Sequence, residues 1–156
     1  MLQSPDLPLS TLVRMTRPGF LAITVVACLL GMASADACGH PPRLWTALAT
    51  LTLACMAHAA GNVLNDVHDA LSGADAANTR GLFPFTGGTR LIQQGVVSVQ
   101  QTRDLARALL WVLVPAGVWL ALKTSPAVLW IGAAGLFLGW AYSARPLALM
   151  SRGLGE

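Results

Sequence analysis

One short stretch of the chain gathers acidic and amide side chains at helical spacing. His58, Asn62, Asn65 or Asp66, and Asp69 recur at steps of three and four residues, which places them on one face if the segment is helical. Like charges one turn apart destabilise a helix unless a cation lies between them. Oxygen ligands suit Mg²⁺, which keeps several waters and commonly bridges to substrate phosphates. The spacing therefore predicts a metal and phosphate site, and the alternative is a set of solvated residues at a helix end.

Two arginines and a glycine pair follow the acidic stretch. Gly87-Gly88 allows close approach of the backbone to a ligand. Arg80 and Arg90 could grip a diphosphate through charge-assisted, bidentate hydrogen bonds. The alternative is that both arginines only belong to the basic side of a membrane protein. Arg90 favours the ligand interpretation more than Arg80 does, because it stands next to the glycine pair.

The elements that must position these groups are marked by four long intervals without a charged residue. They lie between Arg17 and Asp36, Arg43 and Asp66, Arg107 and Lys123, and Lys123 and Arg145. A bilayer span takes about 20 mostly apolar residues, so we expect an all-α integral membrane protein with four transmembrane helices, at about 19–35, 44–65, 105–122 and 126–144. The composition, 54% hydrophobic and 11% charged, excludes a disordered chain. Buried helices of a soluble all-α protein are the alternative for any single interval.

Basic residues are distributed unevenly between the two sides of this layout. If the helices alternate, eight of the 10 Lys and Arg residues share one side: Arg14, Arg17, Arg80, Arg90, Arg103, Arg107, Arg145 and Arg152. The positive-inside rule assigns that side to the cytoplasm. We therefore expect a protein of the cytoplasmic (inner) membrane, with residues 1–18 as a cytoplasmic tail and residues 66–104 as a cytoplasmic, acidic and glycine-rich active-site loop. A net charge of +3 is too small to indicate a nucleic-acid partner.

The first interval has a rival interpretation. Ala33-Ser34-Ala35 is similar to a signal-peptidase site, with Arg14 and Arg17 as the basic region before it. Cleavage there would leave the long acidic loop on the same side of the membrane.

Three pieces of the sequence form one recognisable layout. Arg17-Pro18 opens the first expected helix, Asn65-Asp66-Val-His-Asp69 follows the second, and the segment from Arg145-Pro146 to Glu156 follows the fourth. This layout resembles the UbiA-type family of intramembrane prenyltransferases, whose first motif is Asn-Asp-x-x-Asp. The third acid, Asp75, closes an Asp-x-x-x-Gly-x-Asp pattern that resembles the menaquinone branch, which prenylates 1,4-dihydroxy-2-naphthoate. Val67 stands where that branch commonly has an aromatic residue.

The resemblance implies a reaction and a role for each site residue. The reaction is Mg²⁺-dependent transfer of a polyprenyl group from an allylic prenyl diphosphate to an aromatic acceptor in the bilayer. Asp66 and Asp69 would be catalytic, and Asn65, Arg80 and Arg90 would contact the Mg²⁺–diphosphate group. The metal ligands would be Asn65, Asp66, Asp69 and Asp75.

The resemblance also implies parts that this sequence does not contain. Family members have about nine helices and a second aspartate-rich motif, whereas the only acidic residue after Asp104 is Glu156. We therefore expect residues 1–156 to be part of a prenyltransferase domain, the first part of a nine-helix bundle, with the missing C-terminal half as its partner. The alternative is a non-catalytic four-helix membrane protein that binds lipid diphosphates or a partner subunit.

Overall fold

Every regular element in the described part of the chain is a helix. The computed structural model describes residues 7–78, 80–81 and 88–154. The helices are α1 (Leu9–Met15), α2 (Pro18–Ala37), α3 (Leu44–Ser72), α4 (Ala74–Ala77), α5 (Val99–Lys123), α6 (Ala127–Ser143) and the 3₁₀ helix η1 (Leu149–Arg152). The predicted all-α class with about four membrane helices is confirmed.

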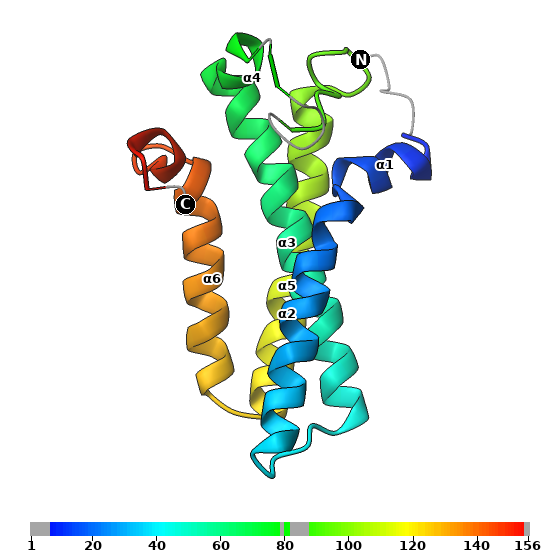
Figure 1. Cartoon of the computed structure of the whole chain (residues 1–156). Coiled ribbons are helices and arrows are strands. Elements are labelled where there is room, and N and C mark those ends of the chain that lie inside the picture. Colours follow the sequence, from blue (N-terminus) through cyan, green and yellow to red (C-terminus); the bar gives the residue numbers. More distant parts are fainter. Residues whose placement is uncertain (1–6, 79, 82–87, 155–156) are drawn as a thin grey trace.

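The four long helices alternate in direction and lie side by side (Figure 1). α3 is central: it contacts α5 most extensively and also α2 and α6. One end of the bundle carries α1, α4, η1, the last turns of α3 and the first turns of α5 (Figure 1). We call this the site end. The opposite end carries the short α2–α3 and α5–α6 connections, with Arg43 just before α3 and Lys123 at the end of α5.

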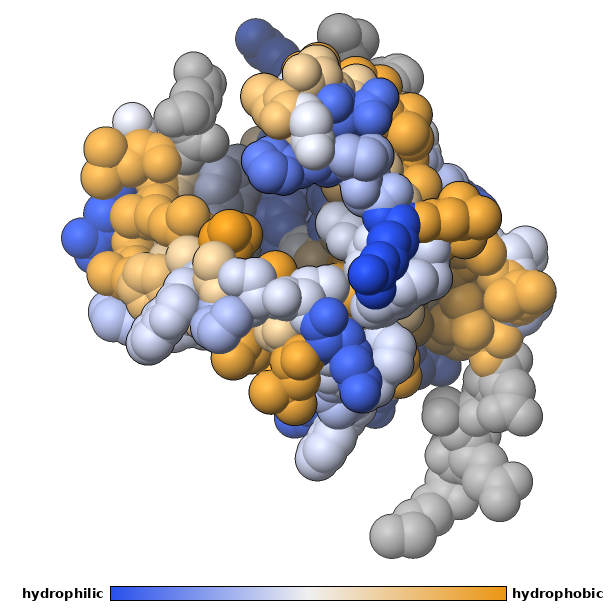
Figure 2. All heavy atoms as spheres, turned by 90° about the horizontal axis from the view of Figure 1, so that it is seen from below, coloured by the Kyte–Doolittle hydropathy of each residue, from blue (hydrophilic) through white to orange (hydrophobic). Residues whose placement is uncertain are grey.

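The outer surfaces of the helices are apolar. α2, α3 and α5 are long and apolar enough to cross a membrane, and α6, with 17 residues, is a shorter apolar helix. No residue in the most apolar part of α2 is buried inside the protein. Figure 2, seen from the end opposite the site, shows apolar side chains around the outside of the helices and a hollow beside α6. Water would not tolerate so large an exposed apolar surface, so lipid must cover it.

Helix boundaries differ from the prediction at two places. α3 continues beyond residue 65 to Ser72, and α5 begins at Val99 instead of near residue 105. The expected 66–104 loop is therefore helical at both ends. α3 ends at Gly73, whose φ of 78° is the left-handed geometry typical of a helix C-terminus. α5 begins with a capping box, in which Ser98 and Gln101 satisfy each other's backbone N–H groups.

The expected tail of residues 1–18 also contains a helix. α1 spans Leu9–Met15, and its residues Thr11 and Met15 are buried. Met15 packs in a core cluster with Val63, Leu91, Val97 and Ala106. This core joins α1, α3, α5 and the loop before α5, and it fixes the residues of the site relative to one another.

Candidate functional site

The polar residues of α3 lie in its C-terminal turns, at the site end of the bundle. α3 has 29 residues, or about 44 Å of helix, and the hydrocarbon core of a bilayer is about 30 Å thick. The C-terminal turns therefore extend beyond the apolar layer. Asp66 and Asp69 lie in these turns and are buried, with 4% and 7% of their surface exposed. The prediction that they continue a helix and share a face agrees with this geometry.

Both carboxylate oxygens of Asp66 contact side chains from distant parts of the chain. Its Oδ1 atom forms an ion pair with Arg17, which lies between α1 and α2. Its Oδ2 atom accepts a hydrogen bond of 2.8 Å from the hydroxyl of Thr89. A Cβ atom at Gly88 would lie 2.6 Å from Asp66 Oδ1 and 2.7 Å from Arg17 Nη2. The backbone at Gly88 therefore closes over the ion pair, whereas the predicted approach of this glycine to a ligand stays a prediction. Gly87 lies outside the described residues.

Asp69 has a buried oxygen atom without a hydrogen-bond partner. Among the described residues, none donates to its Oδ1. Buried polar atoms are almost always paired, and an unpaired one costs about 1–3 kcal/mol, more for a charged group. A cation or a donor supplied by a ligand would satisfy this oxygen.

Asp75 joins the other two carboxylates from α4. It is 3% exposed, and its Oδ2 atom accepts a hydrogen bond of 2.9 Å from Gln93 Nε2. Burial raises the pKa of Asp75, and the nearby charge of Asp66 raises this pKa further. The fold therefore brings three carboxylates into one electrostatic neighbourhood, while Arg17 pairs with one of them.

These carboxylates do not form a closed metal site. Within the described ranges, no three His, Cys, Asp or Glu side chains are placed to hold a metal ion together. Mg²⁺ typically uses one or two protein carboxylates together with waters and substrate phosphates. The unpaired Asp69 oxygen and the surplus of negative charge fit such an open site.

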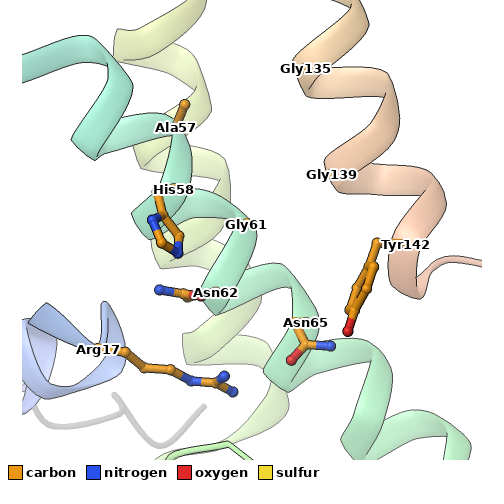
Figure 3. A pocket seen from close by; sticks show the side chains of 9 residues that line it. All are labelled: Arg17, Ala57, His58, Gly61, Asn62, Asn65, Gly135, Gly139 and Tyr142. Carbon is orange, nitrogen blue, oxygen red and sulfur yellow. The ribbon is translucent and has the colours of Figure 1, made fainter. Parts of the chain in front are cut away.

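A cleft between α3 and α6 leads away from the acidic groups. Its volume is about 450 Å³. Figure 3 shows Arg17, His58, Asn62, Asn65 and Tyr142 around its polar part. The cleft is lined in addition by Ala57, Gly61, Gly135 and Gly139. The glycines carry no side chains to fill the space, so the cleft stays open toward the apolar middle of the bundle.

Hydrogen bonds hold the polar lining of this cleft in place. Asn62 Nδ2 donates to the carbonyl oxygen of Thr16 at 3.0 Å. Asn65 Nδ2 donates to Ser143 Oγ, the last residue of α6, at 2.8 Å. Asn65, predicted as a metal ligand, thus also ties the end of α3 to the end of α6.

Comparison with known proteins assigns the family. The family model described as the UbiA prenyltransferase family matches residues 21–155, which include every site residue described above except Arg17. The chain belongs to the UbiA prenyltransferase family. No match was found among curated proteins, and none among solved structures. Membership supports prenyltransferase activity in general, and members of the family bind prenyl diphosphate and aromatic substrates in a membrane.

The two arginines expected to bind diphosphate occupy different positions in this UbiA family member. Arg90 is half-buried, and its Nη1 atom donates to the carbonyl oxygen of Asn78 at 2.6 Å. Its positive charge is close enough to Asp75 to lower that residue's pKa, against the larger effect of burial. Arg80 is exposed. The fold therefore places Arg90, but not Arg80, beside the carboxylates.

Arg17 is the site residue that the sequence did not identify. The sequence assigned it to the Arg-Pro pair that opens the first long helix and to the basic side of the membrane, without a role in the site. Its backbone φ of 53° lies in the left-handed region, where residues other than glycine are uncommon. Pro18 begins α2 directly after it, and Arg17 reaches toward α3 (Figure 3). The proline was the available signal, because it fixes where the chain turns.

Proposed function

We propose that this UbiA family member binds an allylic prenyl diphosphate together with Mg²⁺ at the site end, and takes part in transferring the prenyl group to an aromatic acceptor. The observation that supports this most directly is the buried, unpaired oxygen of Asp69 beside Asp66 and Asp75. Three buried carboxylates at one end of an apolar bundle are costly unless a cation joins them. A membrane-bound prenyl diphosphate would bring its diphosphate to this level of the bilayer.

In this proposal different residues of the site bind the metal and the diphosphate. When bound, Mg²⁺ would neutralise the diphosphate as the allylic carbon–oxygen bond breaks. Asp66, Asp69 and Asp75 would hold the ion directly or through water, with the amide oxygen of Asn65 beside them. Arg90 would donate to diphosphate oxygens through charge-assisted hydrogen bonds. Arg80 would add positive charge from the surface.

The α3–α6 cleft would take the acceptor next to the allylic carbon. Its polar part is lined by His58 and Tyr142, which can hydrogen-bond a hydroxyl group of an aromatic ring. The allylic cation is destroyed by water, so a cleft that opens toward apolar helices favours capture by the electron-rich ring. We propose 1,4-dihydroxy-2-naphthoate as the acceptor, on the Asp69-to-Asp75 spacing, and the inner membrane as the location.

Replacing Asp69 tests the proposed function. We expect Asp69→Asn to abolish Mg²⁺-dependent binding of a labelled prenyl diphosphate, because it removes the carboxylate that faces the metal. The matched control is Asp104→Asn, which removes an exposed acid whose partner is Arg107. Both variants are reconstituted in lipid nanodiscs and titrated with geranyl diphosphate, with and without Mg²⁺. Equal binding by Asp69→Asn and the native chain would refute the proposed site.

The same variants give an independent readout of stability. An unpaired buried charge destabilises the native state, so without metal we expect Asp69→Asn to raise the free energy of unfolding by about 1 kcal/mol. Asp104→Asn should change it by less than about 0.5 kcal/mol. Thermal unfolding in detergent measures both. A loss of stability in Asp69→Asn would mean that the carboxylate serves the fold and not a ligand.

A further inference from the structure

Asp66 cannot accept a metal ion in the arrangement that the structure shows. Arg17 occupies its Oδ1 atom, and the Thr89 hydroxyl occupies its Oδ2 atom at 2.8 Å. The Gly88 backbone closes over the pair, because even a Cβ atom there would touch both Asp66 and Arg17. A guanidinium group at contact distance also repels any second cation. The most strongly expected metal ligand is therefore already neutralised by a group of the protein itself.

Arg17 is held at Asp66 with part of its binding capacity unused. Its side chain is 12% exposed, and its Nε atom is buried without a hydrogen-bond partner among the described residues. A guanidinium group offers five N–H donors in a fixed fork. Its backbone φ of 53° is left-handed, which adds strain that the surrounding contacts must offset. The residue is thus placed for an anion that would engage its fork more fully than Asp66 does.

A second unpaired atom lies on the neighbouring acid. Asp69 Oδ1 lacks a donor, while Arg17 Nε lacks an acceptor. One group of the site needs a cation and another needs an anion. A metal–diphosphate complex carries both charges in one ligand, whereas a free metal ion or a free diphosphate supplies one of them.

We propose that Arg17 is the resident counter-ion of Asp66 and that the Mg²⁺–diphosphate complex exchanges with it. This inference rests on the proposed function and adds which groups are paired before and after the ligand binds. In the ligand-free protein Arg17 neutralises Asp66. On binding, the diphosphate takes over the Arg17 guanidinium group, and Asp66 is released to the metal. Free Mg²⁺ binds weakly because it must displace Arg17 without giving that arginine a new anion.

The exchange explains why a buried arginine and a metal ligand can share one carboxylate. Removing one partner of a buried ion pair leaves the other charge uncompensated, at a cost that far exceeds that of a surface pair. Exchange avoids this cost because each charge is paired before and after binding. It also predicts that loss of Arg17 affects the metal and the diphosphate in opposite directions.

Replacing Arg17 by a neutral residue tests the exchange. Binding of Mn²⁺, an EPR-visible substitute for Mg²⁺, is measured in nanodiscs without diphosphate for the native chain and for Arg17→Gln. A nearby opposite charge shifts the proton affinity of a carboxylate by about 10- to 1000-fold, so we expect Arg17→Gln to bind Mn²⁺ roughly tenfold more tightly, or more. The same variant should bind geranyl diphosphate with Mg²⁺ roughly tenfold more weakly, because a charge-assisted contact is lost.

Two further variants keep the result interpretable. Arg14→Gln removes an exposed positive charge from the same end of the protein and should leave both affinities unchanged, so it controls for net charge. Arg17→Lys keeps the charge and preserves the fold if Arg17→Gln proves unstable. Lysine lacks the fork, so both affinities should fall between those of the native chain and those expected for Arg17→Gln. A merely structural arginine would weaken both ligands together.

The outcomes separate this inference from the proposed function. If Arg17→Gln leaves Mn²⁺ affinity unchanged or lowers it, while the native chain still binds geranyl diphosphate with Mg²⁺ and loses it in Asp69→Asn, the exchange is wrong and the proposed function stands. If Asp69→Asn binds geranyl diphosphate like the native chain, the proposed function itself fails.

Discussion

Gly88 brings the loop backbone against the Arg17–Asp66 ion pair, and a side chain there would displace both partners. Its φ of 74° is also the left-handed geometry that glycine adopts readily. Two separate reasons therefore require glycine at this position: the conformation of the backbone and the closeness of the ion pair. The two reasons can be separated because Gly95 also has a left-handed backbone but has no ion pair beside it.

Substitution of these two glycines measures the close approach. Gly95 has a φ of 70°, with no atom within 4 Å of where a Cβ would lie. Gly95→Ala should cost only backbone strain, whereas Gly88→Ala should cost about 1–3 kcal/mol more, because the methyl group clashes with Asp66 and Arg17. Unfolding in detergent gives both values. Equal costs would mean that the loop does not press on the ion pair.

Asp75 shows how the site concentrates negative charge. Its pKa is raised mainly by burial and then by Asp66, so the folded protein disfavours its charged form. A raised pKa in the native state means that this residue stabilises the fold less as pH rises through that pKa. Gln93 compensates in part by donating a hydrogen bond to Asp75.

At the scale of the elements, α3 and α6 form the two walls of the cleft. At the site end a hydrogen bond from Asn65 to Ser143 joins them. Farther along, Gly61, Gly135 and Gly139 line the cleft, and a Cβ at any of them would meet nothing within 4 Å. The open space thus depends on small residues on both helices.

Filling the cleft from α6 should block the acceptor without disturbing the fold. We expect Gly139→Leu to weaken binding of 1,4-dihydroxy-2-naphthoate by roughly tenfold, or ~1.4 kcal/mol, as followed by fluorescence of the naphthoate. Gly132→Leu is the matched control, because Gly132 lies on the same helix, is equally unobstructed, and is not part of the cleft lining. Equal effects of the two variants would place the acceptor elsewhere.

At the scale of the whole molecule, charge and topology suggest an orientation in the membrane. The alternating helices place the acidic groups, α1 and η1 at the site end, and they place Arg43 and Lys123 at the other end (Figure 1). The positive-inside rule then predicts that the site end faces the cytoplasm. Prenyl diphosphates are highly charged at one end, so the site would face the compartment that supplies them.

Cysteine labelling tests this orientation. Cys38 is exposed in the α2–α3 connection, while Cys28 and Cys55 are half-buried within helices. A membrane-impermeant maleimide should label Cys38 in intact cells. In a chain carrying Cys38→Ser and Arg80→Cys, the same reagent should react only after the membrane is opened. The reverse pattern would place the site end outside.

The 156-residue sequence holds one aspartate-rich motif, whereas the family resemblance implies two. We therefore expect residues 1–156 to bind geranyl diphosphate weakly, because a single cluster of carboxylates would hold the metal.

Two levels of organisation followed from the sequence alone. Long charge-free intervals determined the membrane helices, because backbone groups in lipid must be hydrogen-bonded and a helix of about 20 residues satisfies them within one segment. The three- and four-residue spacing of Asn62, Asn65, Asp66 and Asp69 determined their common face, because helical geometry is local. The ends of the helices were predicted less accurately than their existence. The acidic turns of α3 stay helical because tertiary contacts, including the ion pair of Arg17 with Asp66, offset their charge.

Only the tertiary structure decided which residues meet. Arg17 and Thr89 are far from Asp66 in sequence, and no spacing rule relates them. The fold also placed Arg90 rather than Arg80 near Asp75, through the turn that buries Leu91 and Val97 against α1 and α5. Spacing along a helix is fixed by bond geometry, whereas the pairing of distant charges depends on how the helices and loops pack. For that reason the sequence predicted that Asp66 and Asp69 share a helix face, and only the fold revealed the arginine that neutralises Asp66.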